Sequence, residues 1–315
     1  MSIGVAVIGA GMAGRGHAAA YRAATSLYGS DLPDVKLISI GDVNAQFGLA
    51  AAKRFGFERH DSDWRAIADD PNIHAVSVVV ANSLHREIVE GLLAAGKHVL
   101  CEKPLSDTLD DARSMVAAAN ASDKVARIGL TFLRNPAIAA IQKIISSGQL
   151  GKVLHFTGNY WADYSCDPMS PISWRYKGGM GTGALADVGS HISYVAEFIT
   201  GQTFKSVSGA RFVTSITERP VPSGAVQGHS GATVSDKMDT VENDDYAGFI
   251  ADFGGVAGAI QVSRVAAGHP TSLEFEVYCE KGAARFSQAR NGEFELLLNE
   301  DPYGQRGFRT VQVGP

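Results

Sequence analysis

The sequence lacks three things: a long apolar run, an excess of basic charge and a large set of cysteines. A membrane-spanning helix needs about 20 consecutive apolar residues, and no stretch of this chain approaches that length. The net charge is −5, and the sequence shows no evident basic face for the phosphate contacts that nucleic-acid binding requires. We therefore expect neither a membrane span nor a nucleic-acid partner.

The three cysteines, Cys101, Cys166 and Cys279, are far apart and odd in number, as is typical of proteins from a reducing compartment. The first residues lead directly into a strand pattern, without the basic segment and cleavage site of a secretory signal. No HExxH motif and no Cys/His cluster indicates a metal site. The sequence therefore favours a cytoplasmic protein without a metal.

The 315 residues are enough for about two domains. In the first predicted domain, residues 1–131, strand-like and helix-like segments alternate. The strand-length apolar runs are Val5–Ile8, Val35–Ile40, Val76–Val80, His98–Cys101 and Val125–Leu130. The segments with helical spacing include Ala45–Phe55, Leu84–Ala95 and Leu109–Ala119. Such alternation predicts an α/β Rossmann domain, a doubly wound parallel sheet covered on both faces.

The pattern changes in residues 132–315. After a predicted helix at Pro136–Ser146, alternation with period two dominates, as in Leu273–Val277. Paired glycines in Phe253–Val256 predict a tight hairpin. One helix is expected from Asp187 to Thr200, and the Pro-, Gly- and Ser-rich stretch Arg219–Asp236 is expected to be an exposed loop. The second domain is therefore predicted to be α+β, built on a mostly antiparallel sheet.

A glycine motif follows the first predicted strand and opens the first helix. It reads Gly9-Ala-Gly11-Met12-Ala13-Gly14. In this context the first glycine makes the turn, the second lets backbone approach a pyrophosphate and the third lets helix pack on strand. The helix amino end then offers N–H groups to the phosphates. The motif predicts a dinucleotide site; the alternative is a glycine-rich turn without a ligand.

Asp42 ends the second predicted strand. It lies further from Gly14 than the usual spacing of about 20 residues, which we attribute to a loop inserted at Tyr28–Pro33. A carboxylate here can accept hydrogen bonds from ribose hydroxyls and repels a 2′-phosphate, which favours NAD over NADP. The alternative is a solvated aspartate in a turn.

Four motifs together resemble a known family. They are Gly9–Gly14 followed by His17, then Ala81–His85, Cys101–Pro104 (Cys-Glu-Lys-Pro) and Asp187–His191 (Asp-Val-Gly-Ser-His). On these the chain is identified as a member of the glucose–fructose oxidoreductase/inositol dehydrogenase (Gfo/Idh/MocA) family along essentially all its length. The resemblance implies an NAD-dependent dehydrogenase acting on a sugar, anhydrosugar or cyclitol.

The resemblance also implies roles for individual residues. Those expected at the cofactor, besides the glycine motif and Asp42, are Asn82, His85, Glu102 and Lys103. The expected catalytic residues are Lys103, Asp187 and His191, and the Lys103–Pro104 bond is expected to be cis. Within the family, Asp163–Arg175 and Gly307–Thr310 look most like the levoglucosan dehydrogenase branch.

The chain departs from the family in two places. Family members often have Thr-Pro where this chain has Val80-Ala81, so the loop under the nicotinamide is expected to differ slightly. Members of this type also continue past the final strands into a further segment with a helix. This chain stops at Pro315, so it looks short at its carboxyl end, downstream of every expected site residue.

The chemistry of three residues agrees with alcohol oxidation. His191 can act as the base because an ordinary imidazole has a pKa of about 6.5, near working pH, and Asp187 lies four residues earlier, on the same helix face. Lys103 lies at the carboxyl end of a parallel strand, where doubly wound folds bind ligands, and its ammonium can stabilise an alkoxide. The alternative for Asp187 and His191 is a helix N-cap followed by an ordinary polar histidine. The alternative for Lys103 is a lysine on the surface.

Five further side chains are candidates for the substrate pocket. Trp174 can stack on sugar C–H groups, and Arg175 can donate hydrogen bonds to two hydroxyls. Three weaker candidates, which fit structural roles equally well, are Tyr160, Asp163 and Arg134. Two other functions remain open: a nucleotide-binding, sugar-sensing regulator without catalysis, and a reductase of a non-sugar carbonyl. One uncovered face of the second sheet predicts a homo-oligomer, a dimer or tetramer.

Overall fold

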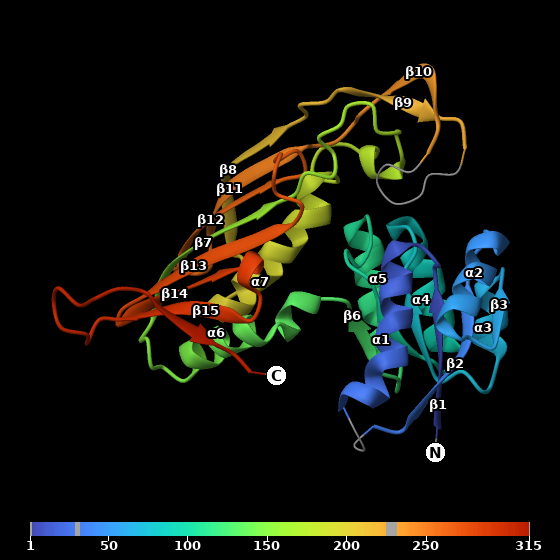
Figure 1. Cartoon of the computed structure of the whole chain (residues 1–315), viewed down its shortest axis with the longest axis horizontal. Coiled ribbons are helices and arrows are strands. Elements are labelled where there is room, and N and C mark those ends of the chain that lie inside the picture. Colours follow the sequence, from blue (N-terminus) through green and yellow to red (C-terminus); the bar gives the residue numbers. More distant parts are fainter. Residues whose placement is uncertain (1, 29–31, 225–231, 315) are drawn as a thin grey trace. The chain divides into compact units, whose positions relative to one another are not determined.

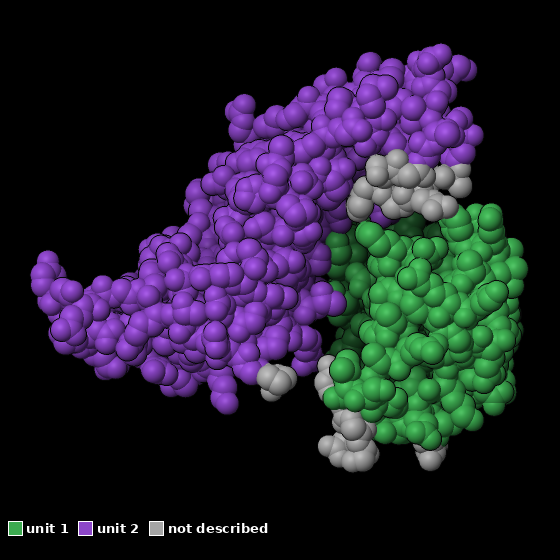
Figure 2. All heavy atoms as spheres, viewed as in Figure 1, with its two compact units in different colours: residues 1–129 green, residues 130–315 purple. Residues whose placement is uncertain are grey.

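The structure is a computed structural model that describes residues 2–28, 32–224 and 232–314. Its contacts divide the chain into two compact units, residues 1–129 and 130–315 (Figure 2). Each unit has its own hydrophobic core. No helix among the described residues has the length and apolar character to cross a bilayer.

Unit 1 is a six-stranded parallel sheet in the order β3-β2-β1-β4-β5-β6 (Figure 1). Its strands are β1 Ser2–Ile8, β2 Asp34–Gly41, β3 Arg59–Asp61, β4 Ala75–Val78, β5 His98–Cys101 and β6 Ala126–Ile128. Its helices are α1 Met12–Tyr28, α2 Ala45–Phe55, α3 Trp64–Asp69, α4 His85–Ala94 and α5 Leu109–Ala121, with a 3-10 turn η2 Asn82–Leu84. This strand order places a topological switch between β1 and β4, where doubly wound folds bind ligands. The prediction of a Rossmann domain is confirmed.

Unit 2 is built on an eight-stranded sheet in the order β16-β15-β14-β13-β7-β12-β11-β8 (Figure 1). Its strands are β7 Val153–Trp161, β8 Ser206–Val213, β11 Tyr246–Asp252, β12 Ala257–Ser263, β13 Ser272–Cys279, β14 Gly282–Ser287, β15 Glu293–Leu298 and β16 Arg309–Gln312. Neighbouring strands are antiparallel except β12 and β7, which pair in parallel. The predicted mostly antiparallel sheet is therefore confirmed.

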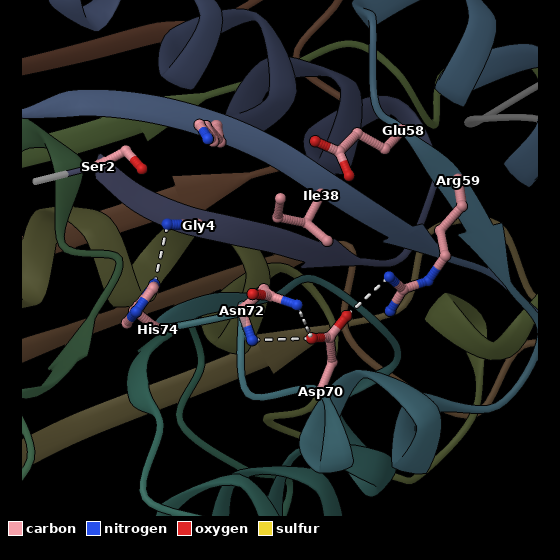
Figure 3. Close-up of a pocket in the computed structure, with 9 residues that line it drawn as sticks. Ser2, Gly4, Ile38, Glu58, Arg59, Asp70, Asn72 and His74 are labelled. Atoms are coloured by element: carbon pink, nitrogen blue, oxygen red, sulfur yellow. Dashed lines mark hydrogen bonds and ion pairs between the residues drawn. The ribbon is translucent and has the colours of Figure 1, made fainter.

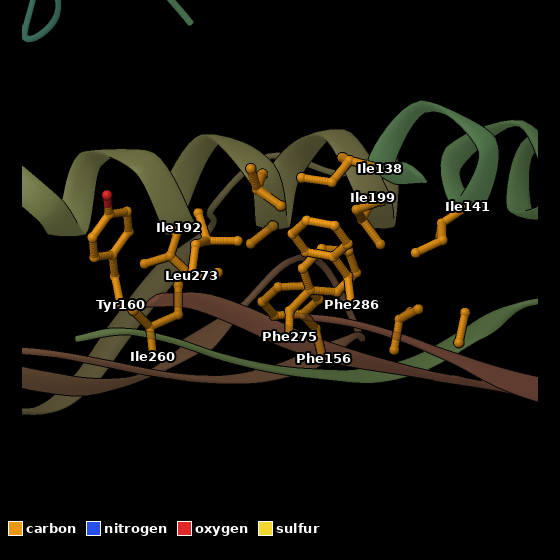
Figure 4. Packing of buried hydrophobic residues seen from close by; sticks show 14 of the residues in the cluster. Ile138, Ile141, Phe156, Tyr160, Ile192, Ile199, Ile260, Leu273, Phe275 and Phe286 are labelled. Atoms are coloured by element: carbon orange, nitrogen blue, oxygen red, sulfur yellow. The ribbon is translucent and has the colours of Figure 1, made fainter. Parts of the chain in front are cut away.

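Two helices cover one face of this sheet. They are α6 Pro136–Ser146, which follows the 3-10 turn η3 Thr131–Arg134, and α7 Ser190–Thr200, which follows the π-helical turn η5 Leu185–Gly189. Two further 3-10 turns are η4 Trp174–Tyr176, before η5, and η6 Gln288–Arg290, between β14 and β15. Figure 4 shows Ile192 and Ile199 of α7 above Phe156, Phe275 and Phe286 of the sheet. Buried and less buried residues alternate along most of β7, β12 and β13, as the period-two pattern predicted.

The prediction that Arg219–Asp236 is an exposed loop is wrong where the structure describes it. β9 Glu218–Pro222 pairs with β10 Val234–Thr240 in a separate two-stranded sheet, and the Arg219 side chain is completely buried. Its guanidinium donates to the carbonyl oxygens of Ser165 and Asp167. Proline and glycine content suggested a loop, but long-range pairing decides the structure. Residues 225–231 of that stretch, like 29–31 in the loop expected at Tyr28–Pro33, lie outside the described ranges.

Candidate active site

The glycine motif forms the turn between β1 and α1. Gly9 has a φ of +107°, a conformation that favours glycine. A Cβ on Gly14 would lie 1.8 Å from the Gly9 carbonyl oxygen, whereas one on Gly11 would meet no atom within 4 Å. Gly11, Met12 and Ala13 are exposed where α1 begins. Gly14 is tightly packed, whereas the backbone at Gly11 is open. This arrangement fits a binding site for a pyrophosphate.

Asp42 is attached to this turn by its carboxylate. One oxygen accepts the N–H of Ala10 at 2.8 Å, and the other accepts the N–H of Asn44 at 2.8 Å. His60 donates from Nε2 to the Asp42 carbonyl oxygen at 2.9 Å. Because each carboxylate oxygen can accept more than one hydrogen bond, Asp42 can hold the glycine turn and still accept from a ribose hydroxyl.

Lys103 follows β5, at the carboxyl end of that strand, and the Lys103–Pro104 bond is cis. The Glu102 carboxylate accepts the Lys103 N–H at 3.1 Å and contacts His17 Nε2 at 3.1 Å. Burial acts to raise the pKa of Glu102, but His17 and the Lys103 amide outweigh it and hold that pKa below its usual value. An ionised Glu102 therefore fixes the backbone on which Lys103 is carried.

His85, predicted at the cofactor, lies beneath the two loops that follow β4 and β5. It is completely buried, with Nδ1 3.1 Å from the carbonyl oxygens of both Pro104 and Leu105 and Nε2 3.2 Å from that of Val80. The imidazole thus joins the loop after β4 to the loop after β5, and its role at the cofactor stays a prediction. Asn82, half-buried in η2, stays a candidate for the cofactor.

In unit 2, Asp187 lies in the π-helical turn that precedes α7, and such turns are frequent at functional sites. The Tyr164 hydroxyl donates to Asp187 Oδ2 at 2.6 Å. Burial, and then the neighbouring Asp187 carboxylate, raise the pKa of Tyr164 well above its ordinary value. Tyr164 thus remains a neutral donor that holds the Asp187 carboxylate in place.

His191, in the first turn of α7, lies among aromatic side chains. Its Nδ1 is 2.9 Å from the Tyr194 hydroxyl, which also accepts the N–H of Phe132 at 3.2 Å. Its ring stacks on Tyr160, with centroids 5.6 Å apart, and meets Phe132 edge-on at 5.1 Å. Burial and the charge of Asp187 raise the pKa of Tyr160. These contacts fix the orientation of the imidazole.

The remaining substrate candidates differ in their placement. Trp174 is 51% exposed, so its indole is accessible, and the Arg175 guanidinium lies over it, 4.4 Å from the ring centroid. Asp163 is half-buried beside Tyr164 in the loop that follows β7. Arg134 is exposed in η3, and no described contact links it to His191.

Two tyrosines that hold the site were not identified from the sequence. Tyr194 lies three residues after His191, a helical spacing that could have indicated the contact. Tyr164 approaches Asp187 from a loop 23 residues earlier, and no local pattern signals that contact. Among the described residues, no group of three His, Cys, Asp or Glu side chains could hold a metal ion.

A cavity of about 330 Å³ lies away from these residues, at the amino ends of the unit 1 strands (Figure 3). Ser2 and Gly4 of β1 and His74 before β4 line it. Its arginine, Arg59, is already paired with Asp70 at 2.7 Å. The cavity is therefore at the opposite edge of the sheet from the glycine turn and Lys103, which both follow carboxyl ends of strands.

Known proteins match this chain over both units. The model of an oxidoreductase family with an NAD-binding Rossmann fold (Gfo/Idh/MocA) matches residues 3–130, and that of the Gfo/Idh/MocA carboxyl-terminal domain matches residues 138–285. Levoglucosan dehydrogenase of Pseudarthrobacter phenanthrenivorans is 36% identical, over 100% of this chain and 81% of the relative. The NAD⁺-dependent scyllo-inositol 2-dehydrogenase of Bacillus subtilis is 27% identical, and the match covers 57% of this chain and 51% of that enzyme.

Solved structures agree with these matches. A levoglucosan dehydrogenase in complex with NADH and L-sorbose superimposes with a TM-score of 0.91 at 33% identity, covering 100% of this chain and 81% of that one. The resemblance seen in the four motifs is thereby confirmed. The chain belongs to the Gfo/Idh/MocA family of NAD-binding oxidoreductases, whose relatives include dehydrogenases of an anhydrosugar and of a cyclitol.

Proposed function

We propose that this enzyme uses NAD to oxidise a hydroxyl of a sugar, an anhydrosugar or a cyclitol. The observation that carries the proposal is the arrangement in unit 2, where a carboxylate held by a buried tyrosine and an imidazole held by a second tyrosine share the start of one helix. The likeness to levoglucosan dehydrogenase over the full chain supports an anhydrosugar as the first substrate to test.

His191 is proposed as the base. Because Nδ1 is engaged by the Tyr194 hydroxyl, proton transfer is assigned to Nε2. In the tautomer that can accept a proton there, Nδ1 carries hydrogen and donates to the tyrosine oxygen. The substrate hydroxyl then gives its proton to Nε2, and the imidazolium formed is stabilised by the same tyrosine oxygen.

Lys103 and Asp187 are proposed to act on the same substrate as His191. The Lys103 ammonium donates to the reacting oxygen and stabilises the negative charge that develops there. The Asp187 carboxylate accepts from a neighbouring hydroxyl, which orients the ring. Trp174 and Arg175 are proposed to supply an apolar face and hydrogen-bond donors, and Tyr160 and Asp163 are proposed to contact the same substrate. A hydroxylated ring suits this mixture of side chains.

The cofactor is proposed to be NAD, with NADP disfavoured. When bound, it supplies the acceptor for the hydride that leaves the substrate carbon. The exposed glycine turn would hold its pyrophosphate and Asp42 its ribose hydroxyls, since a carboxylate so close to the turn repels a 2′-phosphate. A homo-oligomer is part of the proposal and is argued in the Discussion.

The test is NAD reduction, followed by absorbance of NADH, across levoglucosan, inositols and aldoses. We expect turnover with a member of this set. His191→Ala should lower kcat by about 10²–10⁴-fold with NADH affinity nearly unchanged. Oxidation needs neutral His191, so its rate should rise with pH through the histidine pKa, and His191→Ala should lose that rise.

Tyr194→Phe separates positioning from proton transfer. It should lower kcat by about 10-fold but keep the rise with pH, because the imidazole is still present. Tyr303→Phe, which removes a hydroxyl from a side chain that is 95% exposed, is the matched control and should behave as the wild type. NADH binding without turnover on any substrate would favour the sugar-sensing regulator instead, and turnover restricted to non-sugar carbonyls would favour the other alternative.

A further inference from the structure

Three consecutive residues of unit 2 are polar, completely buried and outside the motifs of the family. Asn243, Asp244 and Asp245 lie between β10 and β11, and each is 0% exposed. Burying a carboxylate or an amide is costly unless its atoms are fully hydrogen-bonded. The partners of these side chains therefore indicate what the segment holds in place.

Asp244 binds the amino end of the helical segment that carries Asp187 and His191. One carboxylate oxygen accepts the N–H of Gly181 at 2.7 Å and of Gly183 at 3.2 Å, and the other accepts that of Leu185 at 2.9 Å. Its own carbonyl oxygen accepts the N–H of Ala184 at 2.8 Å.

This contact replaces a local helix cap. No side chain preceding the π-helical turn caps it, so its first N–H groups need other acceptors. The Asp244 carboxylate supplies them and places a negative charge at the positive end of the helix dipole. A Cβ on Gly183 would lie 2.1 Å from the Asp244 carbonyl oxygen, so the close approach requires glycine there.

Asn243 binds a different segment, the turn that carries Trp174 and Arg175. Its Nδ2 donates to the Arg175 carbonyl oxygen at 2.9 Å and to that of Lys177 at 3.1 Å. Its Oδ1 accepts from Arg264 at 2.8 Å, and Arg264 also donates to the Arg175 carbonyl oxygen at 3.0 Å.

Asp245 anchors the group. It pairs with Arg264 at 2.8 Å, where both side chains are almost completely buried. Its other oxygen accepts the N–H groups of Ser215 and Ile216, each at 2.8 Å. The Arg264 guanidinium is thus fixed by a carboxylate while it holds the Arg175 carbonyl.

We propose that Asn243 and Asp244 are positioning residues with separate tasks: Asn243 holds the Trp174–Arg175 turn for substrate affinity, and Asp244 holds the Asp187–His191 helix for turnover. The inference rests on the proposed function, because it assigns binding to one segment and proton transfer to the other. Adjacent residues of one chain segment thereby control KM and kcat independently.

The experiment compares Asn243→Ala and Asp244→Asn with matched controls. Asn299→Ala removes an amide that donates to the Glu280 carbonyl oxygen on the surface. Asp252→Asn alters a carboxylate that accepts the N–H groups of Gly254 and Gly255 in an exposed hairpin. Thermal melting confirms that each variant is folded before kinetics are measured.

We expect Asn243→Ala to raise the substrate KM about 10-fold with kcat changed by less than about 3-fold, since it loosens binding contacts. Asp244→Asn should lower kcat by about 10²-fold, the effect of misplacing a catalytic group by about 1 Å, with KM nearly unchanged. Both controls should match the wild type. If Asp244→Asn does not fold, Gly183→Ala disturbs the same contact from the other side and should give the same loss of kcat.

Folded variants with wild-type kcat and KM, or with equal changes in both parameters at both positions, would overturn the inference and leave the segment a purely structural role. Failure of the proposed function gives a different result, since the wild type itself would then oxidise none of the polyols. In that case Asn243 and Asp244 would lose their assigned tasks together with the reaction.

Discussion

A single residue, Asp42, joins two requirements of a dinucleotide site. Its carboxylate accepts the amides of Ala10 and Asn44, which fixes the glycine turn, and its charge disfavours a 2′-phosphate. The wild type should therefore have a far higher kcat/KM with NAD than with NADP. Asp42→Ala should reduce the ratio of these two kcat/KM values.

The measurement for Asp42 is kcat/KM with each cofactor. Asp34→Ala is the matched control, because it removes the same charge from the exposed beginning of the same strand, β2. It should leave the NAD/NADP ratio unchanged. Comparable efficiency of the wild type with both cofactors would contradict the assignment of Asp42.

Tyr164 gives a pH dependence of stability. Burial and Asp187 raise its pKa in the folded state, so above about pH 10 the unfolded chain loses this proton while the folded protein keeps it. The stabilisation is complete below that pH and is lost as pH rises, by about 1.4 kcal/mol per pH unit. Urea unfolding of the wild type and of Tyr164→Phe from pH 9 to 11 should show a shallower decline for the variant; equal slopes would refute the argument.

At the scale of elements, two glycines of α1 should respond in opposite ways to the same change. A Cβ on Gly14 would collide with the Gly9 carbonyl oxygen, whereas one on exposed Gly16 meets no atom within 4 Å. Gly14→Ala should weaken NADH binding and lower the melting temperature. Gly16→Ala should keep NADH affinity and raise the free energy of unfolding by about 0.5–1 kcal/mol. Binding titrations with NADH and urea unfolding test both variants. Unchanged NADH affinity in Gly14→Ala would argue against a pyrophosphate site at the glycine turn.

Elements with local signals were predictable from sequence. Helices α2 and α6 have the predicted bounds, Ala45–Phe55 and Pro136–Ser146, because Asn44 and Asn135 cap them from the preceding position. β9 and β10 were missed because their pairing depends on residues far apart in the chain. The helix predicted to begin at Asp187 starts two residues earlier as a π-helical turn, since its cap comes from Asp244.

The candidate site divides in the same way. Lys103, Asp187 and His191 could be named because each lies in a short motif with a chemical reason for its residue types. Tyr164 and Asp244 could not, because they reach Asp187 and its helix from 23 and about 60 residues away along the chain. Contacts between segments remote in sequence are set by the packed fold, and one sequence alone does not reveal them.

At the scale of the whole molecule, the eight-stranded sheet has one face that the described helices leave open. The core side chains project from the other face toward α6 and α7. Across the open face, Ile250 of β11, Ala259 of β12 and Thr157 of β7 lie in register, and Ile250 is 53% exposed. Charged side chains concentrate instead on β13 to β15, where Arg285 pairs with Glu295. An uncharged strip on a sheet face is the kind of surface that subunits bury.

We therefore expect a homo-oligomer whose interface centres on β7, β11 and β12. Multi-angle light scattering should give at least a dimer for the wild type. Ala259→Arg places a long cation in the middle of the strip and should shift the protein to monomer, because burying an unpaired charge costs several kcal/mol. Ala94→Arg, an identical change on the exposed surface of α4, should leave the mass unchanged. A monodisperse wild-type monomer would refute the prediction, and an Ala259→Arg protein that keeps the wild-type mass would place the interface on another surface.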